Sequence, residues 1–357
     1  MSTRIVHRPA RLHKKIKADK PIEIAAVPTI RGGGGGGVLM ALMPIVGGAG
    51  MVMMMMSSGN PIRMAIGSVM IVVVLFTAVG AFARNRTGKR KQAEDDRVRF
   101  IEHLGQVEEE IRERAQTQRS EALMRNPAPE MLADVVRDPY RIWERRRGDE
   151  DFLITRIGSG IGELATHVFV KPTNDPMAIS EPIAQAHLDR MLRRTRTIEG
   201  LPMSIPARGV ISLVGPLEQT TAAVRSIVLQ AAVFHAPDDL RIHVAQPYDG
   251  DWLLWLPHIL SPELFDGPIG KREVSHDEES ATELVEEITS RVEELAEKSK
   301  YREATLDRPF FMVIVDMDTP HGKWVAGQLS ALPSVASGRM VLLAMSSSQY
   351  LEPSHVD

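Results

Sequence analysis

Residues 215–222 stand where a nucleotide-binding protein would have its phosphate-binding loop. They follow an apolar run that we predict to be a strand, and they precede a predicted helix, which is the context of the G-x-x-x-x-G-K-[ST] motif. Gly215 matches the first glycine of that motif. Thr220, Thr221 and Ala222 occupy the positions of the second glycine, the lysine and the hydroxyl that binds Mg²⁺. The sequence therefore predicts a degenerate loop.

These changes remove the interactions that would hold a nucleoside triphosphate. A working loop uses backbone N–H groups, one lysine and a bound Mg²⁺. Here Thr221 removes the lysine charge, and Glu218 adds a negative charge beside the expected phosphates. Losing one charge-assisted hydrogen bond costs about 1.5–3 kcal/mol. We therefore expect neither ATP nor Mg²⁺ as a cofactor of these residues, and no catalytic residue.

An acidic residue, Asp316, follows the apolar run 310–315, as in the Walker B element of an ATPase. Without a lysine in the phosphate loop, Asp316 is predicted to be a relic or a structural group. Asp316, Asp318 and His321 could be drawn as a metal site, but polar residues are common in a loop after a strand, and we predict no metal. The chain has no cysteine, which excludes thiolate ligands and disulfides.

The second half of the chain alternates apolar strands with amphipathic helices, a pattern typical of a parallel α/β sheet. We expect a RecA/P-loop-like parallel-sheet domain over residues 129–357, with a degenerate nucleotide site. The predicted strands are 152–157, 164–170, 210–214, 241–245, 310–315 and 340–344, and the predicted helices are 183–194, 220–234 and 280–300.

Two uncharged apolar runs, 38–56 and 64–83, have the length that a helix needs to cross a bilayer. Basic residues flank the pair on both outer sides, which predicts a two-helix transmembrane hairpin over 38–83 with both termini in the cytoplasm. A cleaved signal peptide is the alternative for the first run; it is too long for that role and lacks a small-residue cleavage site.

Charge is divided unevenly along the chain. Residues 1–91 have 14 basic and 2 acidic side chains, although the whole chain has a net charge of −3. The basic arm, 1–37, and the residues after the hairpin would lie against anionic lipid. The remainder is strongly acidic, which argues against a surface that binds nucleic acid.

A polar helix is predicted after the hairpin, and we assign residues 84–128 as a stalk. One apolar seam of coiled-coil spacing runs along it. The pattern is too short for an autonomous coiled coil, so we expect these side chains to contact another subunit. The seam consists of Phe100, Leu104, Val107 and Ile111.

Residues 140–153, with the sequence YRIWERRRGDEDFL, and the following R-I-G-S-G at 156–160 carry a resemblance. They are similar to the L-W-E-R-R…D-F-L…R-x-G-x-G signature of EccC, the FtsK/SpoIIIE-type membrane ATPase of type VII (ESX) secretion systems. Residues 209–216 and 251–258 also resemble that family. The likeness covers essentially the whole chain, whereas family members continue into tandem ATPase domains.

The resemblance implies a function that the residues alone do not. It implies an inner-membrane component that drives export of WXG100, PE and PPE-type substrates, assembles with EccB, EccD and EccE, and forms a hexamer. ATP and Mg²⁺ would belong to C-terminal domains absent from this sequence. An FtsK-like, membrane-anchored DNA translocase is the alternative; the acidic soluble part and the two-span anchor disfavour it.

Overall fold

The computed structural model divides the chain into two compact units, which are treated separately below. The sheet unit comprises Met1–Ile16, Ser120–Gly160 and Gly200–Asp357, and the helix unit comprises Lys17–Arg119 and Ile161–Glu199. The described residues are 8–9, 11, 20–30, 50, 52–54, 57, 61–173, 175, 177–245, 252–300, 309–332, 339–354 and 356.

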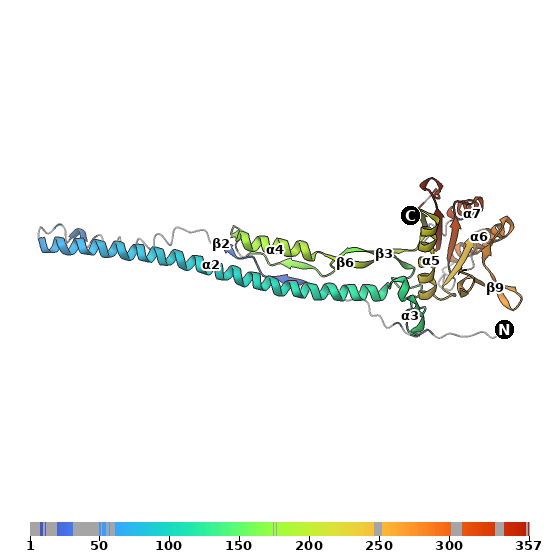
Figure 1. Cartoon of the computed structure of the whole chain (residues 1–357), viewed down its shortest axis with the longest axis horizontal. Coiled ribbons are helices and arrows are strands. Elements are labelled where there is room, and N and C mark those ends of the chain that lie inside the picture. Colours follow the sequence, from blue (N-terminus) through green and yellow to red (C-terminus); the bar gives the residue numbers. More distant parts are fainter. Residues whose placement is uncertain are drawn as a thin grey trace. The chain divides into compact units, whose positions relative to one another are not determined.

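The sheet unit is built on five parallel strands, coloured yellow to red in Figure 1, in the order β11-β8-β12-β13-β7. Every residue of β8 and β13 is buried, as expected for strands covered on both faces. The predicted parallel α/β sheet is therefore confirmed. The strands are β7 (Gly209–Val214), β8 (Leu240–Ala245), β11 (Val274–Ser275), β12 (Phe310–Asp316) and β13 (Met340–Ser346).

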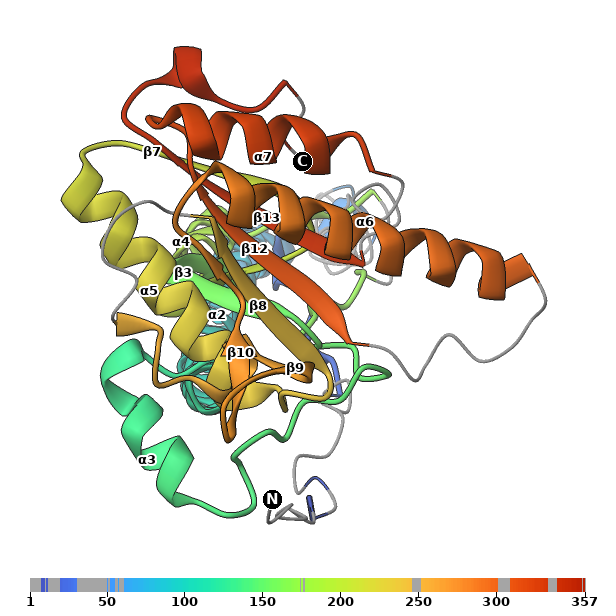
Figure 2. The same ribbon diagram turned by 90° about the vertical axis from the view of Figure 1, so that its right-hand side faces the viewer.

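Helices cover both faces of this sheet (Figure 2). Helix α5 (Leu217–Phe234) packs with Val224, Ile227 and Val228 on one face. Helices α6 (Glu278–Lys300) and α7 (Pro320–Ser330) pack on the other. Because side chains alternate along each strand, the sheet separates two apolar cores, and the unit is doubly wound.

Short elements complete the sheet unit. A 3₁₀ turn, η1 (Pro129–Met131), leads into α3 (Leu132–Arg137). An antiparallel hairpin joins β9 (Leu260–Asp266) to β10 (Ile269–Arg272). Two more 3₁₀ turns are η3 (Pro257–Ile259) and η5 (Gln349–Leu351).

The helix unit packs two helices with short strand pairs. It contains most of α2 (Pro61–Arg125) together with α4 (Pro182–Thr195). Strand β1 (Ile22–Ile24) pairs in parallel with β4 (Val168–Val170), and β2 (Thr29–Ile30) pairs antiparallel with β5 (Ile179–Ser180). Two longer strands, β3 (Ile154–Glu163) and β6 (Thr197–Pro206), pair with each other and contain the boundary between the units.

The apolar seam of the stalk lies in the chain's own core, which corrects the expectation that it contacts another subunit. Phe100, Leu104, Val107 and Ile111 are all at most 5% exposed. They share one cluster with Ile22 and Ile24 of β1 and with Ala184, Leu188 and Met191 of α4. The apolar face of α4 therefore packs against the seam within the same chain. Residues 161–199, expected in the ATPase-like domain, therefore belong with the stalk.

No helix among the described residues is long and apolar enough to cross a membrane. Most of the first predicted span, 38–56, lies outside the described residues, and the second, 64–83, lies within α2. The two-span hairpin stays a prediction.

Candidate functional site

The junction between β7 and α5 differs in length from a phosphate-binding loop. Helix α5 begins at Leu217, three residues earlier than predicted, so only Gly215 and Pro216 connect strand to helix. The Thr220 side chain is 5% exposed, and its hydroxyl donates to the Leu217 carbonyl at 3.1 Å. Residues 217–219 are strong helix formers, which explains the early start. Thr220, Thr221 and Ala222 thus lie inside the helix.

Asp316 is tied into the turn that follows β12. Its side chain is buried, and Oδ1 accepts the Asp318 backbone N–H at 3.0 Å. The backbone of Gly322 approaches so closely that a Cβ atom there would lie 2.0 Å from the Asp316 carbonyl oxygen. Strand β13 lies between β12 and β7, so one strand separates the end of β12 from the β7–α5 junction. These contacts fit a structural group.

Asp318 and His321, which could be drawn as a metal site with Asp316, each contact a different residue. Asp318 accepts from the Ser347 hydroxyl at 2.7 Å, and the His321 Nε2 lies 2.8 Å from the Ser275 hydroxyl. No group of three His, Asp or Glu side chains among the described residues is placed to hold a metal ion.

We expect the chain to show no ATP-dependent rise in melting temperature at millimolar Mg-ATP. The physical reason is that a two-residue junction leaves no loop to surround the phosphates, and Thr221 supplies no cation. Differential scanning fluorimetry measures this, with Thr221→Ala as the matched control. Saturable binding in the micromolar range that Asp316→Ala abolishes would show that the site works.

The signature segment 140–153 caps the C-terminus of α5. The Trp143 backbone N–H donates to the Val233 carbonyl at 2.9 Å, and the Arg145 N–H donates to the Phe234 carbonyl at 3.0 Å. The Trp143 indole Nε1–H donates to the Ala232 carbonyl at 3.1 Å. The last carbonyls of a helix have no partner within the helix. The signature supplies those partners.

Two residues of the signature adopt a left-handed backbone conformation without being glycine. The φ angles of Trp143 and Leu153 are 54° and 59°, and such a conformation costs about 1–2 kcal/mol per residue. Leu153 is fully buried, and its N–H donates to the His235 Nε2 at 3.0 Å. The surrounding contacts therefore hold both residues in place.

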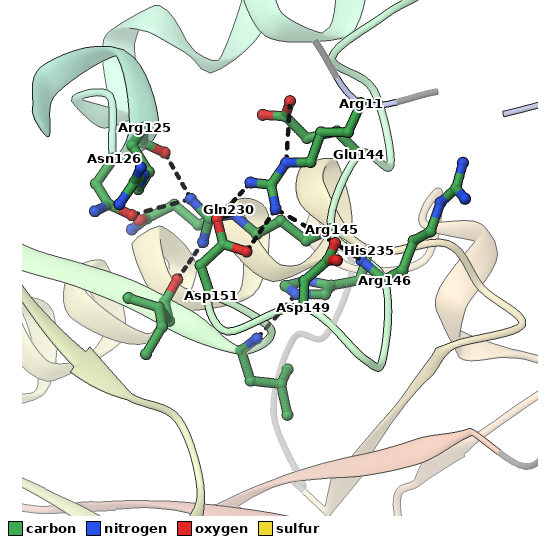
Figure 3. Close-up of polar contacts among 12 residues, drawn as sticks. Arg11, Arg125, Asn126, Glu144, Arg145, Arg146, Asp149, Asp151, Gln230 and His235 are labelled. Carbon is green, nitrogen blue, oxygen red and sulfur yellow. Dashed lines mark hydrogen bonds and ion pairs between the residues drawn. The ribbon is translucent and has the colours of Figure 1, made fainter. Parts of the chain in front are cut away.

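Arg145 is the charged centre of this segment, and it is only 1% exposed. Its guanidinium donates to the carbonyls of Arg125 and Ile154 at 2.6 and 2.5 Å and to the Asn126 side chain at 2.9 Å (Figure 3). It also lies 4.0 Å from the centre of the Phe234 ring. Burial lowers the pKa of Arg145 to about 10, although Asp151 and Glu144 oppose this shift. Arg145 therefore stays charged at neutral pH.

The carboxylates around Arg145 receive a second arginine from the N-terminal arm. Arg11 forms a two-bond contact with Asp151, with Nη1 2.7 Å from Oδ1, and lies 3.3 Å from Asp149 and 3.9 Å from Glu144 (Figure 3). The hydrogen bond to Asp151 raises the pKa of Arg11. Burial acts to raise the pKa of Asp151, but Arg11 and Arg145 outweigh it and lower that pKa.

A fourth carboxylate contacts two more arginines. Asp239 lies 2.5 Å from Arg8 and 2.7 Å from Arg147. No sequence pattern predicts this role for the arm, because nothing distinguishes Arg8 and Arg11 from its other six basic residues. The arm was expected to lie against lipid, whereas these two residues contact the signature segment.

His235 joins α5 to the signature in a neutral form. Its Nδ1 lies 2.8 Å from the Ala231 carbonyl, so this nitrogen has the proton, and Nε2 accepts from Leu153. The Nε2 of His258 lies 2.8 Å from the His235 carbonyl. Burial lowers the pKa of His235 to about 3 and that of His258 to about 4.

Comparison with known proteins places these features in a family. The chain is 30% identical over 263 residues to the ESX secretion system protein EccC of Thermomonospora curvata, covering 72% of this chain and 20% of that protein. It is 33% identical over 220 residues to the ESX-3 secretion system protein EccC3 of Mycobacterium tuberculosis, covering 59% and 16%. It is 25% identical over 266 residues to EccC of Geobacillus thermodenitrificans, covering 70% and 17%.

Other comparisons add little. No family model matches the chain. The solved cytoplasmic domain of Thermomonospora curvata EccC aligns at 16% identity with a TM-score of 0.34, covering 60% of this chain and 24% of that one; a likeness at this level supports no argument.

The fold defines a doubly wound, parallel α/β protein in which two residues connect β7 to α5. The chain belongs to the EccC family of ESX secretion-system proteins. It spans about one fifth of the length of the curated relatives it matches.

Proposed function

We propose that residues 1–357 are the non-catalytic, membrane-proximal part of an ESX secretion motor. The observation that supports this most directly is the two-residue β7–α5 junction, which retains the strand–helix context of an ATPase without its phosphate loop. In this proposal, ATP and Mg²⁺ act in further domains of the full-length protein. This part transmits their conformational changes to the membrane.

The proposed membrane anchor is the hairpin over 38–83. Within the second span, large apolar side chains of α2 point outward around the helix, and Phe76 is 81% exposed. A stripe on one face would indicate packing on a protein core, whereas exposure all round suits lipid. The exposed side chains are Ile66, Val69, Ile71, Val72, Val73, Leu75, Phe76 and Val79. Basic residues at 84–91 would then lie at the inner surface.

The proposed partners follow from the family. They are the membrane components EccB, EccD and EccE and further copies of this chain in a hexamer, and the exported substrates are of the WXG100, PE and PPE types. The acidic character of residues 92–357 disfavours a DNA partner.

Cysteine labelling in cells tests the anchor. A cysteine replacing Ser58 is expected to react with an impermeant thiol reagent from outside, because it would lie in the outer loop of the hairpin. Cysteines replacing Ser2 or Thr87 are the matched controls and should stay unlabelled. Labelling of Thr87→Cys from outside would contradict the proposed topology.

The same cells test the secretion role. Deleting residues 61–83 from the full-length protein should abolish both membrane retention and export of a WXG100-type substrate. Export that continues without membrane retention would contradict the proposed coupling.

A further inference from the structure

A pocket of about 300 Å³ lies between the β9–β10 hairpin and α6, away from the β7–α5 junction. Leu264 of β9, Val274 of β11 and Leu284 of α6 form its apolar walls. Glu273, Glu283, Glu286 and Glu287 also line it. Apolar walls with several acids suit an elongated group that has an aliphatic stem and a positive head.

Glu273 is the innermost acid, and it is only 6% exposed. Neither carboxylate oxygen has a well-formed hydrogen bond among the described residues, although the Ser261 hydroxyl interacts with Glu273 and acts to lower its pKa. The nearest ring nitrogen, His243 Nε2, lies 3.0 Å from Oε2. Burial raises the pKa of Glu273 to about 7, and Glu287 adds to the rise. A buried carboxyl without full hydrogen bonding is costly, so a cation entering the pocket would stabilise its ionised form.

The charges around the pocket make one kind of ligand favourable. Lys271 pairs with Glu283 at 2.9 Å on the rim, and Arg291 pairs with Glu287. Arg241 and Arg291 act to lower the pKa of Glu273, but less strongly than burial raises it. Four glutamates outnumber the two basic residues of the lining, Lys271 and Arg272, which disfavours an anion such as a nucleotide. The described residues offer no set of three ligands for a metal ion, which leaves an organic cation.

We propose that this pocket binds the side chain of a lysine or arginine supplied by a protein partner. Its volume, at the lower end for ligand pockets, fits one long side chain. The aliphatic stem would lie along Leu264, Val274 and Leu284, and the positive head would reach Glu273. The site is independent of the secretion role proposed above.

Apolar residues beside the pocket indicate that the cation belongs to a protein. Leu264, Phe265 and Ile269 of the hairpin are 47–53% exposed. Gly270 lets the two strands approach, because a Cβ there would lie 2.4 Å from the Ser261 carbonyl oxygen. Exposed apolar side chains around a buried polar anchor are typical of a protein-binding surface.

Calorimetry with agmatine, a four-carbon stem with a guanidinium at one end and an ammonium group at the other, tests the pocket on the full 357-residue chain. We expect saturable binding near 1 mM, accompanied at pH 6.5 by proton release that scales with the ionisation enthalpy of the buffer. Glu273→Gln should weaken binding at least tenfold, because it removes the charge at constant size. Glu279→Gln, on α6 but outside the pocket lining, is the matched control and should bind normally.

A second variant keeps the test decisive if Glu273→Gln fails to fold. Leu264→Lys places an ammonium group at the pocket wall and should block agmatine. For the partner, a photo-crosslinking amino acid at Phe265 in cells should give an adduct that Glu273→Gln removes. No saturable agmatine binding, equal loss in Glu279→Gln, or crosslinking unaffected by Glu273→Gln would each overturn the proposal.

Discussion

Replacing Arg145 by leucine is expected to lower the free energy of unfolding of the sheet unit by about 3–5 kcal/mol, the usual cost of breaking a buried ion pair on one side. The change leaves the Ile154 and Arg125 carbonyls and the Asn126 side chain without their donor. It also leaves the half-buried Asp151 with one arginine fewer. The stacking on Phe234 is lost as well.

Urea denaturation followed by tryptophan fluorescence measures this effect, because all four tryptophans of the chain lie in the sheet unit. Arg146→Leu is the matched control. Arg146 is the next residue along, it is exposed, and it donates to the Pro9 carbonyl at 2.9 Å, so its loss should cost less than about 1 kcal/mol. A cost for Arg145→Leu as small as that of the control would show that the buried network does not stabilise the unit.

The sequence predicted those parts of the fold that repeat a simple pattern. Apolar runs predicted the bounds of β12 and β13 to within two residues at each end, because a strand buried on both faces must be apolar throughout. The seam of α2 was recognised as an apolar stripe, but its partner was assigned wrongly. Periodicity reports that a helix has an apolar face, and it does not report which segment covers that face.

The polar contacts of the candidate site could not be predicted in the same way. Arg11 reaches Asp149 and Asp151 across about 140 residues of sequence, and no local pattern marks such a pairing. The phosphate-loop motif predicts a loop up to Gln219, whereas α5 begins three residues before Thr220, at Leu217. Glu273 is held in its buried position by backbone hydrogen bonds to Ile259 and Val244, which no local sequence pattern predicts.

The sheet unit is expected to lose about 3 kcal/mol of stability between pH 6.5 and pH 5. Burial lowers the pKa values of His235 and His243 to about 3 and that of His258 to about 4. The unfolded chain binds three protons at these residues as the pH falls below about 6.5, whereas the folded chain binds them only near pH 3–4. Their contribution is therefore complete above pH 6.5 and is lost progressively below it.

Glu273 opposes this loss, and the net result follows from counting protons. Its pKa is raised to about 7, so the folded chain holds one proton between pH 4.5 and 7 that the unfolded chain releases. The unfolded chain binds three more protons at the histidines, and the folded chain binds one more at Glu273. The difference of about two protons lowers the free energy of unfolding by roughly 2.7 kcal/mol per pH unit at the steepest point. Histidine in the unfolded chain is already half protonated at pH 6.5. The total loss of stability between pH 6.5 and pH 5 is therefore about 3 kcal/mol.

Urea denaturation at pH 6.5 and pH 5, followed by tryptophan fluorescence, measures the loss directly. His243→Gln should reduce it to about half, because glutamine does not titrate and one of the three protons is removed. His276→Gln is the matched control, since His276 lies in the same unit but is exposed, and it should leave the pH dependence unchanged. Stability that stays constant from pH 6.5 to pH 5 would show that the three buried histidines are protonated in the folded chain.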